Sequence, residues 1–185
     1  MKRVFSVFIF FVAVVAQAEP FKEASPESLK QATKQMNALN KAMTDGVAIL
    51  KRGDSAAITA HSKRFSALVA SGESQFGNTI FEPLGSCSVA GSFSRTWWNA
   101  QLFAAYNGGV EQRLGSIKDT LSEFQAKRDE CLQSSDPVIA AKAAAESDAD
   151  LKKKFGGGRE CLTVFTVDSE TKELVEKPKP AHCKS

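Results

Sequence analysis

The stretch that decides the fold is Ser25–Gly53, SPESLKQATKQMNALNKAMTDGVAILKRG. Ser25 is a favoured helix N-cap, Pro26 suits the first helical position, and Gly53 suits the left-handed residue that ends a helix. Between them, apolar or small residues recur at alternating steps of three and four, which places them on one helix face. The pattern predicts a helix to Arg52 that packs against other helices. The residues of this face are Leu29, Ala32, Met36, Leu39, Met43, Gly46 and Leu50.

A second helix is predicted to begin after Asp54, an N-cap residue, and to end at Gly72. The stretch 72–92 contains four glycine or proline residues after its first position, so we expect an ordered loop that packs over the core. Cys87 falls within this expected loop. The apolar face of the second helix consists of Ile58, His61, Phe65, Leu68 and Val69.

A helical region is predicted to resume at Ser92 and to run to Gln133. Its apolar stripe changes phase at Asn107-Gly108-Gly109, and two adjacent glycines cost roughly 2 kcal/mol in a helix interior. We therefore expect a break or sharp kink there. The stripe after the break consists of Val110, Leu114, Ile117, Leu121, Phe124 and Cys131.

The C-terminal part changes from a helical to a strand-like pattern. Asp136-Pro137 predicts the start of an alanine-rich helix that the glycines 156–158 end. Residues then alternate with a period of two over 162–167, and a polar turn at 168–172 leads into Leu174-Val175, which is typical of a β-hairpin. The sequence thus predicts a mainly α fold: a helical bundle with a small disulfide-stapled hairpin within residues 160–183.

The cysteine count is even, and the four residues are Cys87, Cys131, Cys161 and Cys183. In an exported chain such a set is typical of two disulfides. If Cys161 pairs with Cys183 across the hairpin, Cys87 is left for Cys131. An unbroken helix from Ser92 to Cys131 would span about 60 Å, far more than the disulfide limit of about 7 Å between Cα atoms. Either the chain reverses at the glycines, or the cysteines pair otherwise.

Residues 1–18 have the pattern of a secretory signal peptide: Lys2 and Arg3, then an apolar run over 4–15, then Ala16-Gln17-Ala18. We expect cleavage near Ala18, a periplasmic or secreted location, and a single domain over residues 19–185. The apolar run is too short to span a membrane, and no second one follows. Removing residues 1–18, which contain two basic residues, lowers the net charge from +3 to about +1. Such a balance does not favour a nucleic-acid partner.

Motifs for a cofactor or a metal are weak, so we expect neither. His61 and His182 are the two histidines, and no Cys-x-x-Cys occurs. A zinc site of Cys161, His182 and Cys183 would lack a standard spacing. Met36 or Met43 with His61 as haem ligands is another possibility, although methionines more often fill a helical core.

Aromatic residues gather at the head of the third helical region, where Arg95 precedes Trp97 and Trp98. Successive tryptophans lie about 100° apart on a helix, so we expect one of them to be partly exposed. Arginine and tryptophan are enriched at interface hot spots. This predicts a binding surface formed by Arg95, Trp97 and Trp98. The alternative is that the preceding loop covers the second tryptophan.

Taken together, these sequence features favour an exported, non-enzymatic protein-binding module whose partner is another protein. An inhibitor, or an immunity protein against a secreted toxin, would fit this class. The alternatives are an adaptor of an envelope secretion machine, a helical-bundle carrier of haem or another ligand, and an enzyme whose site has no local motif. A binder should expose apolar surface on a patch or protrusion, whereas an enzyme should have a pocket with convergent polar groups.

Overall fold

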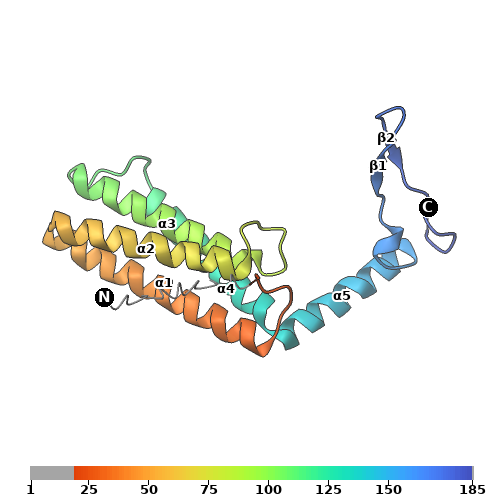
Figure 1. Cartoon of the computed structure of the whole chain (residues 1–185), viewed down its shortest axis with the longest axis horizontal. Helices are drawn as coiled ribbons and strands as arrows, with labels where there is room; N and C mark the ends of the chain where they lie inside the picture. The colour runs from red at the N-terminus through yellow and green to blue at the C-terminus, as the bar shows by residue number, and fades with distance from the viewer. Residues whose placement is uncertain (1–18, 185) are drawn as a thin grey trace, which may run out of the picture.

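The computed structural model describes residues 19–184, which form five α-helices followed by a short 3-10 turn and a two-stranded hairpin. Helices α1 to α4 lie side by side and form a helical body, and α5 extends away from it with the hairpin at its far end (Figure 1). The predicted fold class is confirmed. The predicted signal peptide lies outside the described residues. The elements are α1 (Pro26–Arg52), α2 (Ser55–Phe76), α3 (Gly85–Tyr106), α4 (Ser116–Ser135), α5 (Pro137–Phe155), η1 (Arg159–Cys161), β1 (Phe165–Val167) and β2 (Leu174–Glu176).

Helix α1 has the caps and the buried face that its sequence predicts. The Ser25 hydroxyl accepts from the Ser28 amide at 3.0 Å, and the Ser28 hydroxyl accepts from the Ser25 amide at 2.8 Å, which is a capping box. Gly53 ends the helix at φ 69°. Leu29 and Leu50 are partly buried, and the rest of the predicted face is fully buried. These fully buried residues are Ala32, Met36, Leu39, Met43 and Gly46.

The predicted end of the second helix at Gly72 is wrong, because α2 continues to Phe76. Gly72 is buried, and a Cβ there would lie 2.8 Å from Nε2 of Gln35 on α1. That same Nε2 donates to the Leu68 carbonyl at 2.8 Å. The glycine is thus needed for the close approach of α1 and α2, and the helix hydrogen bonds continue through it.

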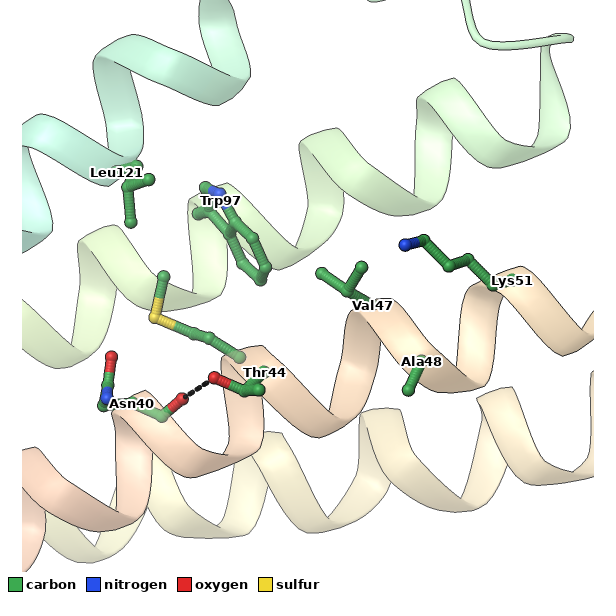
Figure 2. Close-up of a pocket in the computed structure, with 8 residues that line it drawn as sticks. Asn40, Thr44, Val47, Ala48, Lys51, Trp97 and Leu121 are labelled. Atoms are coloured by element: carbon green, nitrogen blue, oxygen red, sulfur yellow. Dashed lines mark hydrogen bonds between the residues drawn. The ribbon is translucent and has the colours of Figure 1, made fainter.

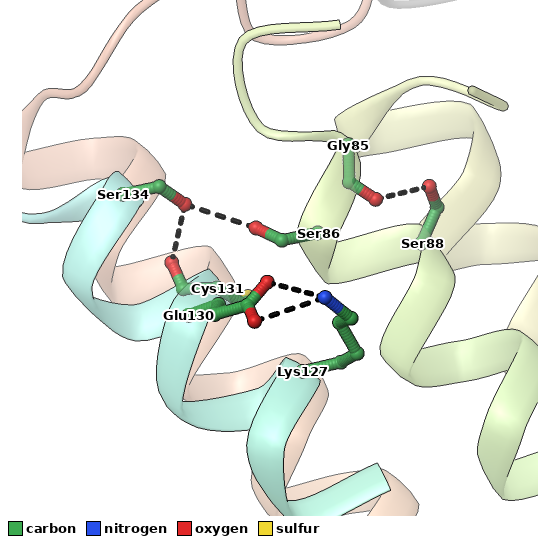
Figure 3. Close-up of polar contacts among 7 residues, drawn as sticks. All are labelled: Gly85, Ser86, Ser88, Lys127, Glu130, Cys131 and Ser134. Carbon is green, nitrogen blue, oxygen red and sulfur yellow. Dashed lines mark hydrogen bonds and ion pairs between the residues drawn. The ribbon is translucent and has the colours of Figure 1, made fainter. Parts of the chain in front are cut away.

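The predicted loop over 72–92 is also largely wrong: α3 begins at Gly85, so Cys87 lies on a helix. The first turns of α3 consist mostly of small residues, which give no apolar periodicity in the sequence but let a neighbouring helix approach closely. Cys87 forms a disulfide with Cys131 on α4, with a Cα–Cα distance of 4.6 Å. Next to it, the hydroxyls of Ser86 and Ser134 form a hydrogen bond of 3.1 Å between the same two helices (Figure 3).

The predicted break at Asn107-Gly108-Gly109 is confirmed. Helix α3 ends at Tyr106, Gly108 and Gly109 adopt positive φ angles of 64° and 88°, and α4 returns antiparallel from Ser116. The reversal brings Cys131 back to Cys87, as the geometric argument requires. The second pair, Cys161–Cys183, also forms.

Asp136 is the N-cap of helix α5, and its carboxylate accepts from the amides of Val138 and Ile139 at 2.8 and 3.2 Å. No residue of α5 is buried. Beyond it, β1 and β2 pair antiparallel, with Thr166 opposite Val175. None of the helices in residues 19–184 is long and apolar enough to cross a membrane.

Candidate protein-binding surfaces

An apolar groove runs along α1, between α1 and the pair α3 and α4 (Figure 2). Its volume is about 480 Å³, which is in the range of small-molecule and side-chain binding sites. Trp97 from α3 and Leu121 from α4 line one side, and α1 lines the other. The α1 residues that line it are Asn40, Met43, Thr44, Val47, Ala48 and Lys51.

Trp97 is the largest side chain that lines this groove, which we call the Trp97 groove. The six-membered ring of its indole points towards α1, and its nitrogen lies at the opposite end (Figure 2). Nε1 is buried and has no hydrogen-bond partner in the described part of the chain. The Thr44 hydroxyl donates to the Asn40 carbonyl at 3.0 Å, so it is already paired within α1. The groove thus offers apolar contact and few free polar groups.

A second depression of about 410 Å³ continues the groove towards the end of α1. It shares Val47 and Lys51 with the first, and adds Leu50, Ala104 and Ile117. Lys51 is the only ionisable side chain among the described residues that line the two depressions. The two depressions together form a mostly apolar surface with one cation, Lys51. Such a surface suits the binding of an apolar segment of a partner better than it suits catalysis.

Trp98 lies on the other side of α3, inside the helical body, so the expected partial exposure of one tryptophan is wrong. Its ring packs against His61 at 4.9 Å and against Phe65 at 6.1 Å between centroids, and its Nε1 donates to Ser62 at 3.1 Å. Both tryptophans are buried. The alternative of a covering loop is wrong as well, because side chains of α2 cover Trp98.

Arg95 is exposed and lies two residues before Trp97, about 200° around the helix. The structure therefore does not gather Arg95, Trp97 and Trp98 into one surface. Of the three, Trp97 is the one that lines a groove. Binding through any of them stays a prediction.

The hairpin carries a second apolar surface. By strand alternation and the observed register, Phe165, Val167 and Leu174 share one face of the two-stranded sheet with Glu176, the partner of Phe165. The three apolar residues are 59%, 62% and 72% exposed. Val164 and Val175 are about half exposed as well. We call Phe165, Val167 and Leu174 the hairpin face.

A corner at the base of the hairpin brings together Glu160, Cys161, His182 and Cys183. Cys161 and Cys183 are bonded, and His182 Nε2 lies 3.3 Å from Glu160 Oε1. Hydrogen bonding, first to the backbone of residues 160 and 158 and then to His182, lowers the pKa of Glu160. In the hairpin turn, the amides of Thr171 and Glu170 lower the pKa of Asp168. Both shifts come from local contacts of exposed carboxylates.

Among the described residues, this corner is the one place where three possible metal ligands cluster: the ligand atoms of Cys161, His182 and Cys183 lie within 4.8 Å of one another. Both thiols are consumed by the disulfide. The residues of the haem hypothesis, Met36, Met43 and His61, are all buried, and the His61 ring packs against aromatic rings on α2 and α3, as is typical of core side chains.

Sequence reasoning identified Met43 and Trp97 but not the groove between them. Val47 and Leu121 also line it. Leu121 belongs to the predicted apolar stripe, which indicates burial rather than a groove, and Val47 lies outside the predicted face of α1. These side chains are uncovered on one side because of the way α4 is placed against α1. Glu160 was also missed, although a Cys161–Cys183 pair brings together the residues that precede the two cysteines, Glu160 and His182.

Comparison with known proteins finds no matching family model, no matching curated sequence and no matching solved structure.

Proposed function

We propose that this chain is an exported, non-enzymatic protein-binding module that holds a partner protein through the hairpin face and the Trp97 groove. The observation that carries the proposal is the position of the hairpin face. Three large apolar side chains are more than half exposed at the far end of a helix that has no buried residue of its own. Exposed apolar groups gathered on a protrusion are typical of interaction sites.

A non-enzymatic role is supported by where the groups with shifted pKa lie. Burial lowers the pKa of His61, whose ring is enclosed by Phe65 and Trp98. Glu160 and Asp168 are exposed carboxylates held by local hydrogen bonds. None of these groups lines the Trp97 groove, and neither does the exposed Glu19–Lys22 ion pair, whose pKa values are also shifted. Glu160 alone lines another depression, of about 260 Å³, at the base of the hairpin. Catalytic sites instead collect perturbed acids and bases in a pocket.

Export is supported by two independent features. The pattern of residues 1–18 is that of a secretory signal, and both cysteine pairs form disulfides, which persist in oxidising compartments. Within this class, an inhibitor that inserts the hairpin into another protein's cleft fits the protrusion best, and an adaptor of an envelope machine is the alternative.

The test is affinity capture with the purified, oxidised protein from envelope and secreted fractions, followed by mass spectrometry and a measured Kd for the retained partner. We expect Phe165→Ser with Leu174→Ser to weaken this Kd by at least about tenfold, since interface anchors contribute about 2 kcal/mol or more. Thr44→Arg, which places a charge at the mouth of the groove, tests the second surface.

Val138→Ser is the matched control. Val138 is 77% exposed on α5 and lies outside both surfaces, so its substitution removes a similar apolar group without touching either. If the partner binds the hairpin variant and the Thr44→Arg variant as tightly as it binds the unmodified protein, the proposed surfaces are wrong. Circular dichroism spectra that match the unmodified protein show that each variant is folded.

A further inference from the structure

The corner at the base of the hairpin holds four metal-ligand groups on two adjacent pairs of residues. Glu160 and Cys161 come from η1, and His182 and Cys183 come from the returning C-terminal segment. Cys161 is fully buried, while the side chains of Glu160 and His182 are about half exposed. The corner is therefore open to solvent on one side and closed on the other.

The C-terminal segment is fixed in this corner by the end of α5. The Lys184 amide donates to the Phe155 carbonyl at 2.7 Å, and the Lys184 ammonium donates to the Lys153 carbonyl at 3.0 Å. On the other side, the Gly158 amide donates to Glu160 Oε1 at 2.8 Å. Together with the disulfide, these contacts hold His182 and Glu160 in place.

The donor atoms converge beside Gly157. A Cβ built on Gly157 would lie 2.6 Å from Cys161 Sγ, 2.7 Å from Glu160 Oε1 and 2.8 Å from His182 Nε2. Sulfur, oxygen and nitrogen thus face one small space that no side chain fills. Cys183 Sγ lies within 4.8 Å of the Cys161 and His182 donors, and Glu160 lies at the edge of this group, with its Oε1 3.3 Å from His182 Nε2.

We propose that reduction of the Cys161–Cys183 disulfide by a dithiol converts this corner into a binding site for one Zn²⁺ ion, with Cys161, Cys183, His182 and Glu160 as ligands. The dithiol transfers two electrons and two protons, which gives two thiols and the oxidised, cyclic form of the reductant. The metal then displaces both thiol protons. Two thiolates, one imidazole and one carboxylate suit tetrahedral zinc, whose bonds of about 2.0–2.3 Å place ligand atoms about 3.3–3.8 Å apart.

Selective reduction is favoured by the different exposure of the two disulfides. Cys87 and Cys131 are both buried in the helical body, whereas Cys183 is partly exposed. The corner can hold either the disulfide or the metal ion, but not both. Neither form depends on the proposed partner.

The experiment uses the purified protein, reduced with stoichiometric dithiothreitol, desalted without oxygen and titrated with Co²⁺, which reports zinc-type sites by its colour. We expect two free thiols, mapped to Cys161 and Cys183, and one bound Co²⁺ with a thiolate charge-transfer absorption. The oxidised protein should show no such absorption.

Three variants decide the ligand set: His182→Asn, Glu160→Gln and Gly157→Ala, the last filling the space with a methyl group. Each should weaken Co²⁺ binding by at least about tenfold while leaving the thiol count unchanged. Equal binding in all three would overturn the proposal, as would no binding by the reduced protein. Binding that survives Cys161→Ser with Cys183→Ser would place the metal elsewhere and overturn it too.

Discussion

Gly46 on α1 lies where three helices of the core pack closely together. A Cβ there would lie 2.6 Å from Cζ3 of Trp98 on α3 and 3.0 Å from Nε2 of His61 on α2. The absence of a side chain at this position lets the indole of Trp98 pack directly against the α1 backbone.

Replacing Gly46 with Ala should lower the free energy of unfolding by about 1–3 kcal/mol, because the overpacked core must shift two aromatic rings. Urea denaturation measures the change. The matched control is Gly91→Ala on α3, where the new Cβ would meet Val69 Cγ1 at an ordinary 3.5 Å. That substitution should stabilise the protein by about 0.5–1 kcal/mol through helix propensity. Equal effects of the two substitutions would contradict this account of Gly46.

His61 predicts a pH dependence of stability. Burial lowers its pKa below the ordinary value of 6.5, and Arg64 adds to this, while the Ala42 carbonyl and Asp45 oppose it. The unfolded chain therefore binds a proton at a higher pH than the folded protein does. Stability is complete above about pH 6.5 and falls as the pH decreases from there towards the folded-state pKa.

The measurement is the free energy of unfolding between pH 8 and pH 5 for the protein and for His61→Phe, which keeps an aromatic ring but cannot titrate. We expect the loss below about pH 6.5 to be smaller in the variant. His182→Asn, which removes the exposed histidine, is the control and should keep the full slope. If His61→Phe and the unmodified protein lose stability equally, His61 is not the group responsible.

At the scale of elements, the sequence could predict those helices whose caps and apolar periodicity agree. Helices α1 and α5 begin and end at the predicted caps, and the reversal after α3 follows from adjacent glycines at positive φ. At Gly72 the same kind of signal led to a wrong prediction: the helix does not end there, because this glycine allows close contact with Gln35 and does not form a turn. A single sequence does not distinguish these two uses of glycine.

The start of α3 and the Trp97 groove could not be predicted for a related reason. The helical turns around Cys87 and Ser88 carry small side chains, so the sequence shows no apolar periodicity there. The helix is recognised only from its packing against α4. The groove exists only between three helices, and its depth depends on their spacing. The hairpin face, in contrast, follows from alternation within one short segment.

Helix α5 should be the least protected helix of the molecule. It has no buried side chain among its 19 residues, and most helical stability in proteins comes from packing of an apolar face against other elements. In hydrogen exchange followed by mass spectrometry, we expect amides of 140–155 to exchange well before those of α4, a helix of similar length within the body. Equal protection of α4 and α5 would mean that α5 is stabilised by contacts beyond those described.

For the whole molecule, the two disulfides should differ in what they stabilise. Cys87–Cys131 joins two helices of the body across 44 residues, and replacing both with Ser should lower the free energy of unfolding by about 4 kcal/mol. Cys161–Cys183 lies beyond α5, so its replacement should disorder the hairpin and leave the unfolding of the body unchanged. Thermal unfolding followed by circular dichroism tests the body, and proteolysis between residues 162 and 183 tests the hairpin. A large loss of body stability in Cys161→Ser with Cys183→Ser would contradict this division.

Asp136 is both the C-cap of α4 and the N-cap of α5, so one residue joins the helical body to everything beyond it. Helix α5 is about 28 Å long, and a rotation of about 10° at this joint displaces its far end by about 5 Å. Because the helix is long, a small change in one backbone dihedral angle of Asp136 would move the hairpin by about the width of a side chain. The placement of the hairpin face relative to the helical body therefore depends on the backbone conformation of this single residue.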